Sequence, residues 1–279
     1  MAICNIIWDV DPVWFSIGGI VDIRPYSILF GIGMYLGYWF VKVMYKREGK
    51  TEQELLTLAV YIFFGVIIGA RLGHCLFYDF NYYASHPLEI ILPFKIHDGT
   101  FEITGYQGLA SHGGALGVLI AIAIFCYKYN INYLSQVDKI AIVAPLTGAF
   151  IRLGNLINSE IIGKPTDLPF AFVFVRVDNL SRHPSQLYES LFYILIFIIL
   201  WTIYKKSGNK FTPGFYTGLS ITLIFGVRFI IEFTKIHQSA FEQAQPLDMG
   251  QILSIPFILA GLFLIMRRGN LSLRKKNTI

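Results

Sequence analysis

Seven long apolar runs constrain this chain more than any other feature of its sequence. They cover roughly residues 26–45, 55–77, 109–127, 137–157, 187–204, 214–233 and 249–266. A helix of about 20 apolar residues is long enough to cross the hydrocarbon core of a bilayer, and it satisfies its own backbone hydrogen bonds there. The pattern therefore predicts an all-α integral membrane protein with about seven transmembrane helices.

Composition supports the same class. Only 15% of the 279 residues are charged, whereas soluble domains carry about 25%. The net charge of +5 does not indicate a nucleic-acid partner, because the basic residues gather in short clusters at the ends of apolar runs, as in polytopic membrane proteins. We expect a single membrane domain over residues 1–279, with outer loops at roughly 79–108 and 159–186.

The basic clusters also predict an orientation. They follow the first, third, fifth and seventh runs, and their members include Lys46, Arg47, Lys50, Lys128, Lys205, Lys206, Lys210 and Arg267. With seven spans these clusters all lie on one side of the membrane, which is the cytoplasmic side by the positive-inside rule. We therefore expect the N-terminus outside and the C-terminus in the cytoplasm.

A polar stretch, RLGNLINSE at residues 152–160, closes the fourth apolar run. An Arg or Asp at membrane depth costs roughly 2.5–3.5 kcal/mol on the insertion scale, so such groups persist only where they find partners or a wet cavity. An ionisable residue there is by default a hypothesis for a functional site. The candidates are Arg152, Asn155, Asn158 and Glu160.

Histidine and arginine also occur in other runs. His112 opens the third run within SHGGALG, where glycines allow close approach to an imidazole that can relay a proton. The alternative is a histidine that only hydrogen-bonds a neighbour at a helix N-terminus. Arg71 lies in the second run, and its alternative role is a structural pair with a carboxylate on another span. Arg228 and Glu232 lie four apart in the sixth run, and their alternative is a local ion pair.

The stretch HPSQLYE at 183–189 leads into the fifth run and places Ser185, Gln186 and Tyr188 at its start. Part of this stretch is explained if its side chains cap the helix N-terminus and place a negative charge near the positive end of the helix dipole. Its polar side chains exceed what capping needs, so we expect them to line the same cavity. Tyr26 precedes the first run, where an interfacial aromatic belt is the alternative interpretation.

Several arginines, a histidine and several amides within apolar runs suit an anionic amphiphile, since guanidinium forms bidentate hydrogen bonds to phosphate. The sequence contains no CxxC motif or Cys/His spacing typical of a metal site. It also contains no Gly-rich phosphate loop typical of a nucleotide-binding protein. The residues alone therefore predict a membrane protein that binds a phospholipid headgroup, without a metal or cofactor.

Six motifs, in this order along the chain, resemble those of the bacterial prolipoprotein diacylglyceryl transferases. They are RPY at 24–26, GARLGH at 69–74, SHGGALG at 111–117, RLGNLINSE at 152–160, HPSQLYE at 183–189 and RFIIEF at 228–233. The resemblance implies seven spans in the bacterial cytoplasmic (inner) membrane. It also implies transfer of the diacylglyceryl group of phosphatidylglycerol to the lipobox cysteine of a prolipoprotein signal peptide, with release of glycerol phosphate.

The resemblance also implies roles for individual residues. Arg152 and Arg228 resemble the arginines that hold the phosphate, and His112 resembles the essential histidine, a candidate base for the thiol. The expected substrate-binding residues are Tyr26, Arg71, Asn155, Asn158, Glu160, Ser185, Gln186, Tyr188 and Glu232. A transporter of phospholipids or small anions is the alternative function, although no internal repeat is evident.

Overall fold

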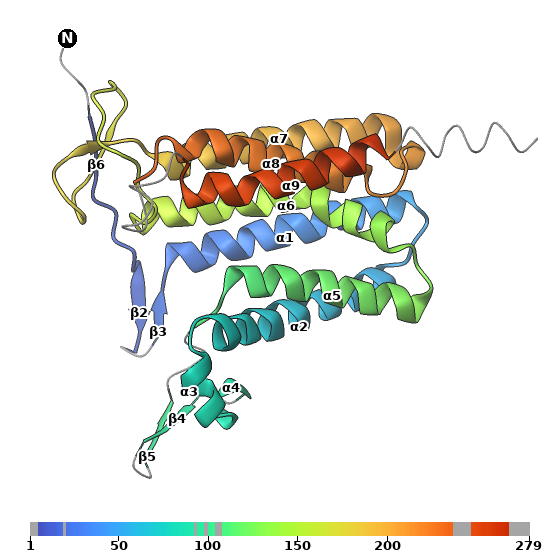
Figure 1. Cartoon of the computed structure of the whole chain (residues 1–279), viewed down its shortest axis with the longest axis horizontal. Coiled ribbons are helices and arrows are strands. Elements are labelled where there is room, and N and C mark those ends of the chain that lie inside the picture. The colour runs from blue at the N-terminus through green and yellow to red at the C-terminus, as the bar shows by residue number, and fades with distance from the viewer. Residues whose placement is uncertain are drawn as a thin grey trace, which may run out of the picture. The chain divides into compact units, whose positions relative to one another are not determined.

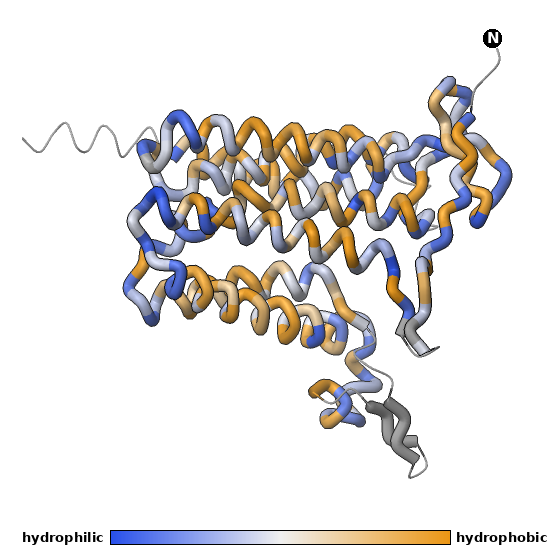
Figure 2. The backbone as a smooth tube through the Cα atoms, turned by 180° about the vertical axis from the view of Figure 1, so that it is seen from behind, coloured by the Kyte–Doolittle hydropathy of each residue, from blue (hydrophilic) through white to orange (hydrophobic). Residues whose placement is uncertain are grey.

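A computed structural model describes residues 5–18, 21–91, 94–97, 100–103, 108–236 and 247–267. Seven of its helices are long and apolar enough to cross a membrane, which confirms the predicted all-α membrane fold. They are α1 (Pro25–Arg47), α2 (Glu52–Phe77), α5 (Ser111–Tyr129), α6 (Tyr133–Ile157), α7 (Ser185–Ser207), α8 (Phe215–Glu232) and α9 (Met249–Met266). Figure 2 shows hydrophobic residues along these helices and hydrophilic residues near many of their ends. α6 continues through Pro145.

The segments between the long helices contain short elements. After α2 come α3 (Phe80–Ser85), α4 (Leu88–Ile91), β4 (Phe94–His97) and β5 (Thr100–Ile103), and η1 (Gly208–Lys210) follows α7. The remaining strands are β1 (Ile6–Trp8), β2 (Phe15–Ile17), β3 (Val21–Ile23), β6 (Phe172–Phe174) and β7 (Ser181–Arg182). Within a three-stranded sheet, β6 pairs with β1 in parallel and with β7 in antiparallel orientation. The segments expected to be loops thus carry small amounts of regular structure.

The chain divides into two compact units. Unit 1 comprises Met1–Val41 and Asp138–Ile279, and unit 2 comprises Lys42–Val137. Helices α1 and α6 each contribute to both units. The expected single domain over residues 1–279 stays a prediction.

Unit 2 is built on close contact between α2 and α5, which lie side by side in Figure 1. Glycines on both helices make this possible, because a Cβ at Gly69 would lie 2.8 Å from the Cα of Gly117. Small residues at such contacts let two transmembrane backbones approach closely. Cys75 and Cys126 are buried free thiols in these helices.

In unit 1, α6, α7, α8 and α9 run beside one another (Figure 1). Asp138 near the start of α6 accepts hydrogen bonds from the backbone N–H groups of Gly214 and Thr217, both at 2.8 Å. These donors belong to the first turn of α8, which would otherwise lack acceptors. Asp138 therefore caps α8 from a neighbouring helix. The Ser190 hydroxyl of α7 donates to the carbonyl of Ala149 in α6 at 3.0 Å.

The three-stranded sheet is anchored to the C-terminal end of α6. The indole N–H of Trp8 in β1 donates to the carbonyl of Leu156 at 2.9 Å. Leu156, Phe172 and Phe174 form a buried cluster against which Trp8 packs. The sheet thereby fixes the end of the helix that carries the polar stretch 152–160.

Candidate functional site

The polar stretch begins within α6 and turns back on itself. Ser159 adopts a left-handed conformation with φ 56°. The N–H of Glu160 donates to the carbonyl of Asn155 at 2.9 Å, and that of Ser159 donates to Leu156 at 3.1 Å. This pair of bonds is the Schellman pattern of helix termination. It brings the Glu160 side chain back over the last turn of α6.

Side-chain hydrogen bonds connect four of the predicted residues in a chain. Arg152 Nη1 donates to Asn155 Oδ1 at 3.1 Å, and Asn155 Nδ2 donates to Glu160 Oε2 at 3.0 Å. Asn158 Nδ2 donates to the other carboxylate oxygen of Glu160 at 3.1 Å. Gln186 of α7 donates to the Glu160 backbone carbonyl at 2.5 Å. The structure thus brings Arg152, Asn155, Asn158, Glu160 and Gln186 together.

Two residues absent from the predicted site complete this network. Glu189 of α7 is 0% exposed, and its Oε2 lies 2.6 Å from Nε of Arg152 in an ion pair. Its Oε1 accepts a hydrogen bond from the buried Lys235 Nζ at 2.9 Å, and the same ammonium donates to Glu232 Oε2 at 2.9 Å. The sequence offered one signal for Lys235, its position three residues after Glu232.

Arg228 differs from the other cations of this site. Within the described residues no hydrogen bond or ion pair holds its side chain, and its Nε is buried without an acceptor. The alternative of a local Arg228–Glu232 ion pair is not formed, because Glu232 pairs with Lys235. The charges of Arg152 and Arg228 both act on the buried Tyr193 of α7. Two guanidinium groups therefore approach one buried tyrosine.

Tyr26 packs its ring against the backbone of Gly154. A Cβ at that glycine would lie 2.6 Å from Cδ2 of the ring. The charges of Glu160 and Arg152 both act on the Tyr26 hydroxyl. The glycine of the polar stretch thus makes room for the predicted tyrosine.

Ser185 and Tyr188 contact neighbours at the edge of this network. The buried Ser185 Oγ lies 2.9 Å from Thr234 Oγ1 in the segment after α8. The Tyr188 hydroxyl lies 3.3 Å from Nδ1 of His183. Burial lowers the pKa of His183, which favours the neutral ring.

Arg71 and His112 belong to unit 2. Arg71 donates to the backbone carbonyls of Glu89 at 2.5 Å and Ile90 at 3.1 Å, and it lies over the ring of Tyr83. Both of these carbonyls belong to α4. His112 is exposed at the second position of α5, next to Gly113.

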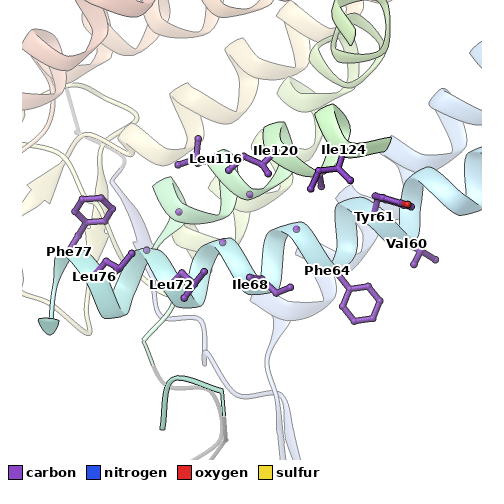
Figure 3. A pocket seen from close by; sticks show the side chains of 16 residues that line it. Val60, Tyr61, Phe64, Ile68, Leu72, Leu76, Phe77, Leu116, Ile120 and Ile124 are labelled. Atoms are coloured by element: carbon purple, nitrogen blue, oxygen red, sulfur yellow. The ribbon is translucent and has the colours of Figure 1, made fainter. Parts of the chain in front are cut away.

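Unit 2 also holds an apolar cavity of about 580 Å³ between α2 and α5. Figure 3 shows Ile68 and Leu72 from α2 and Leu116 and Ile120 from α5 along it. Among its described lining residues only Tyr61 has a polar side-chain group. Such a lining suits hydrocarbon and excludes charged ligands.

In the part of the chain that the structure describes, no three His, Cys, Asp or Glu side chains gather in a way that could hold a metal ion. The side chains that the structure brings together at the site are cations, carboxylates, amides and a tyrosine. A guanidinium group can bind a phosphate, and Glu189 and Asn155 fix that of Arg152 in place.

Comparison with known proteins identifies the family. The family model for prolipoprotein diacylglyceryl transferase matches residues 12–267. The chain belongs to this family. A phosphatidylglycerol–prolipoprotein diacylglyceryl transferase of Bacteroides fragilis is 47% identical over 95% of the chain and 96% of its own length. Those of Tolumonas auensis and Porphyromonas gingivalis are 44% and 40% identical, over 93% and 94% of the chain and 96% and 94% of their own lengths.

Membership in the prolipoprotein diacylglyceryl transferase family confirms the resemblance inferred from the six motifs. Together with the seven apolar helices, it makes the protein a multi-pass protein of the bacterial inner membrane. The roles of individual residues remain predictions.

Proposed function

We propose that this protein transfers the diacylglyceryl group of phosphatidylglycerol to the lipobox cysteine thiol of a prolipoprotein. The sulfur attacks the carbon of the diacylglyceryl group that bears the phosphate oxygen. A C–S bond forms at this carbon, and its C–O bond to the phosphate breaks. Glycerol phosphate leaves with the bonding electrons, and the thiol proton passes to a base. No other reactant is needed.

The Arg228 guanidinium, which has no hydrogen bond or ion pair with the described residues, carries this proposal. Its Nε is buried and no acidic partner lies against it among the described residues, an arrangement that a ligand supplying negative charge would stabilise. A phosphodiester between Arg228 and Arg152 would do so, and Tyr193 lies near both arginines. As the C–O bond breaks, negative charge grows on the leaving oxygen, and preorganised guanidinium groups stabilise it.

Arg152 is oriented for this task by its existing partners. Its Nε faces Glu189, and its Nη1 donates to Asn155. The remaining N–H groups of a guanidinium with two fixed contacts are available for phosphate oxygens. Asn158 and Glu160 extend the network, and Tyr26 closes it at Gly154. In this proposal these residues shape the headgroup site.

Activation of the thiol is assigned through the family resemblance. A thiol with a pKa of about 8.5 becomes a good nucleophile only as the thiolate, and nearby cations or a base promote that form. We assign the base to His112. Arg71 acts indirectly in this proposal, by holding α4, and Ser185, Gln186 and Tyr188 act by fixing the start of α7.

The proposed partners are phosphatidylglycerol, a prolipoprotein signal peptide with its lipobox cysteine, and the surrounding bilayer. The proposal includes the orientation predicted from the basic clusters, with the N-terminus outside and the C-terminus in the cytoplasm. The polar end of α6 then lies at the outer side, where secreted precursors emerge.

The test uses purified protein in detergent, phosphatidylglycerol labelled in its glycerol headgroup, and a lipobox peptide with Cys or Ser at the acceptor position. We expect labelled glycerol phosphate only when lipid and Cys peptide are both present. Release with the Ser peptide would indicate a lipase, because no thiol would be consumed. Binding of intact lipid with no release, and its movement between leaflets in vesicles, would support the transporter alternative.

A further inference from the structure

Arg228 and Glu232 should pair by helix geometry, and they do not. Residues four apart on a helix are neighbours, with Cβ atoms about 5–6 Å apart. Opposite charges at this spacing ordinarily attract each other, more strongly where water is scarce. Instead the Glu232 carboxylate lies 2.9 Å from the ammonium of Lys235.

Lys235 is held in place to make this contact. Its side chain is 4% exposed, and its backbone pairs with Gly163 in an isolated β-bridge. The adjacent Thr234 carbonyl accepts a hydrogen bond from the N–H of Lys164 at 2.7 Å. The chain after α8 is thus tied to the segment after α6, and the ammonium is fixed between Glu189 and Glu232.

The charges around Lys235 show what this arrangement achieves. Glu189 and Glu232 are both buried, and Lys235 contacts both. With Arg152 engaged by Glu189, each of these two carboxylates contacts a cation, whereas Arg228 contacts no carboxylate among the described residues. Without Lys235, Glu232 would be a buried carboxylate lacking a cation, and Arg228 is its neighbour on the same helix.

We infer that Lys235 is a positioning residue that keeps Glu232 away from Arg228, so that Arg228 remains available for the phosphate of the lipid substrate. This inference rests on the proposed function. Lys235 itself need not touch the substrate. Without Lys235, Glu232 should form an ion pair with Arg228 and so compete with the phosphate of the lipid for this guanidinium.

The test is a double-mutant cycle with labelled phosphatidylglycerol, in which kcat and KM are measured for the headgroup release. We expect Lys235→Met to lower kcat/KM by roughly tenfold or more, which is within the range of coupling between buried charges. The rise in KM for the lipid should account for much of this loss. Lys235→Arg keeps the cation and should stay within roughly threefold of wild type.

The Glu232→Gln substitution separates this positioning role of Lys235 from a purely structural one. Glu232→Gln removes the competing acid, so Glu232→Gln/Lys235→Met should recover activity to within roughly threefold of Glu232→Gln alone. Lys206→Met, at an exposed lysine in the last turn of α7, is the matched control and should retain activity. Thermal unfolding in detergent is compared across the set.

Two results would overturn the inference. One is full activity of Lys235→Met, and the other is an equal loss from this substitution in the wild type and in the Glu232→Gln variant. If Lys235→Met alone does not accumulate, Glu232→Gln is compared with the double variant, whose charge is balanced, and a tenfold difference between them counts against the inference. Absence of headgroup release from the wild type would instead refute the proposed function.

Discussion

Arg152 and Glu189 form an ion pair between adjacent helices, with 2.6 Å between Nε and Oε2 and with Glu189 fully buried. Because the carboxylate meets Nε, the terminal amino groups of the guanidinium are directed elsewhere, and one of them donates to Asn155. A planar fork with several donors can serve a carboxylate, an amide and a phosphate at once. An ammonium cannot reproduce this geometry.

Arg152→Lys should therefore lower kcat/KM by about 100-fold, the size expected when one preorganised donor of an oxyanion site is lost. Headgroup release by the purified variant measures the effect. Arg176→Lys, at an exposed arginine near β6, is the control. Near-normal activity of Arg152→Lys would mean that a simple positive charge is enough there.

His112→Gln should abolish transfer while the protein still inserts in the membrane, because glutamine cannot accept the thiol proton. The measurement is thioether formation on the Cys peptide at equal membrane abundance. His86→Gln is the matched control, since His86 is exposed in unit 2 and its ring contacts the carbonyl of Tyr82. Activity of the His112 variant comparable to wild type would remove this histidine from the mechanism.

The seven helices could be predicted because length and apolar composition suffice to identify a span. The grouping of Arg152 with Asn155, Asn158 and Glu160 was also accessible, since these residues share one helix end. The pairing of Glu232 was not accessible. It depends on how the chain after α8 joins the segment at Gly163, a contact between positions far apart in the sequence.

Other features could not be predicted from the sequence, for different physical reasons. The strands have two to four residues, which is too short for an alternating pattern to emerge. Arg71 bonds to backbone carbonyls of Glu89 and Ile90, which carry no side-chain signature. Glu189 belongs to the stretch expected to line the cavity, but its pairing with Arg152 and Lys235 arises only when the helices pack.

Ser185→Ala should lower the free energy of unfolding by about 1 kcal/mol, the usual net value of a buried hydrogen bond. Its hydroxyl joins the start of α7 to Thr234. Thermal unfolding in detergent measures this loss. Thr234→Val removes the other partner of the same hydrogen bond, so the double variant should lose little more free energy of unfolding than either single variant. We expect a loss of transfer below tenfold, and complete inactivation of a well-folded variant would assign the hydroxyl a more direct role.

The pair Asp178 and Arg182 should make the sheet region sensitive to acid. Hydrogen bonds from Arg182 lower the pKa of Asp178 below its ordinary value. A carboxylate with a lowered folded-state pKa contributes stability above its unfolded pKa of about 3.9, and that contribution is lost as the pH falls through the folded value.

Asp178→Asn should accordingly be less stable than wild type at pH 7, by up to about 1 kcal/mol. The difference should begin to shrink as the pH falls below about 4 and should disappear once the pH is below the lowered folded-state pKa of Asp178. Thermal unfolding followed across this pH range measures it. Asp167→Asn, at an exposed aspartate of the same region, should match wild type at every pH. A difference between wild type and Asp178→Asn that stays constant with pH would contradict the assignment.

Gly69→Ala should weaken the packing of α2 on α5. The added Cβ would lie 2.8 Å from the Cα of Gly117, which is backbone and cannot rotate away. Overpacking of this kind costs about 1–3 kcal/mol. Gly31→Ala is the control, since nothing lies within 4 Å of a Cβ there. Equal thermal stability of the two variants would show that the helices separate without cost.

The cap that Asp138 provides for α8 has a consequence far from its own position. Asp138 links the start of α6 to the start of α8. Arg152 and Arg228 lie toward the other ends of these two helices. At about 1.5 Å per residue, each arginine is roughly 16–21 Å along its helix from the hydrogen bonds of Asp138. A tilt of about 3° at Asp138 would change the spacing of the guanidinium groups by about 1 Å, a misplacement that can cost about 100-fold in rate. Under the proposed function, the spacing of the two arginines around the phosphate therefore depends partly on Asp138, which lies far from both along the helices.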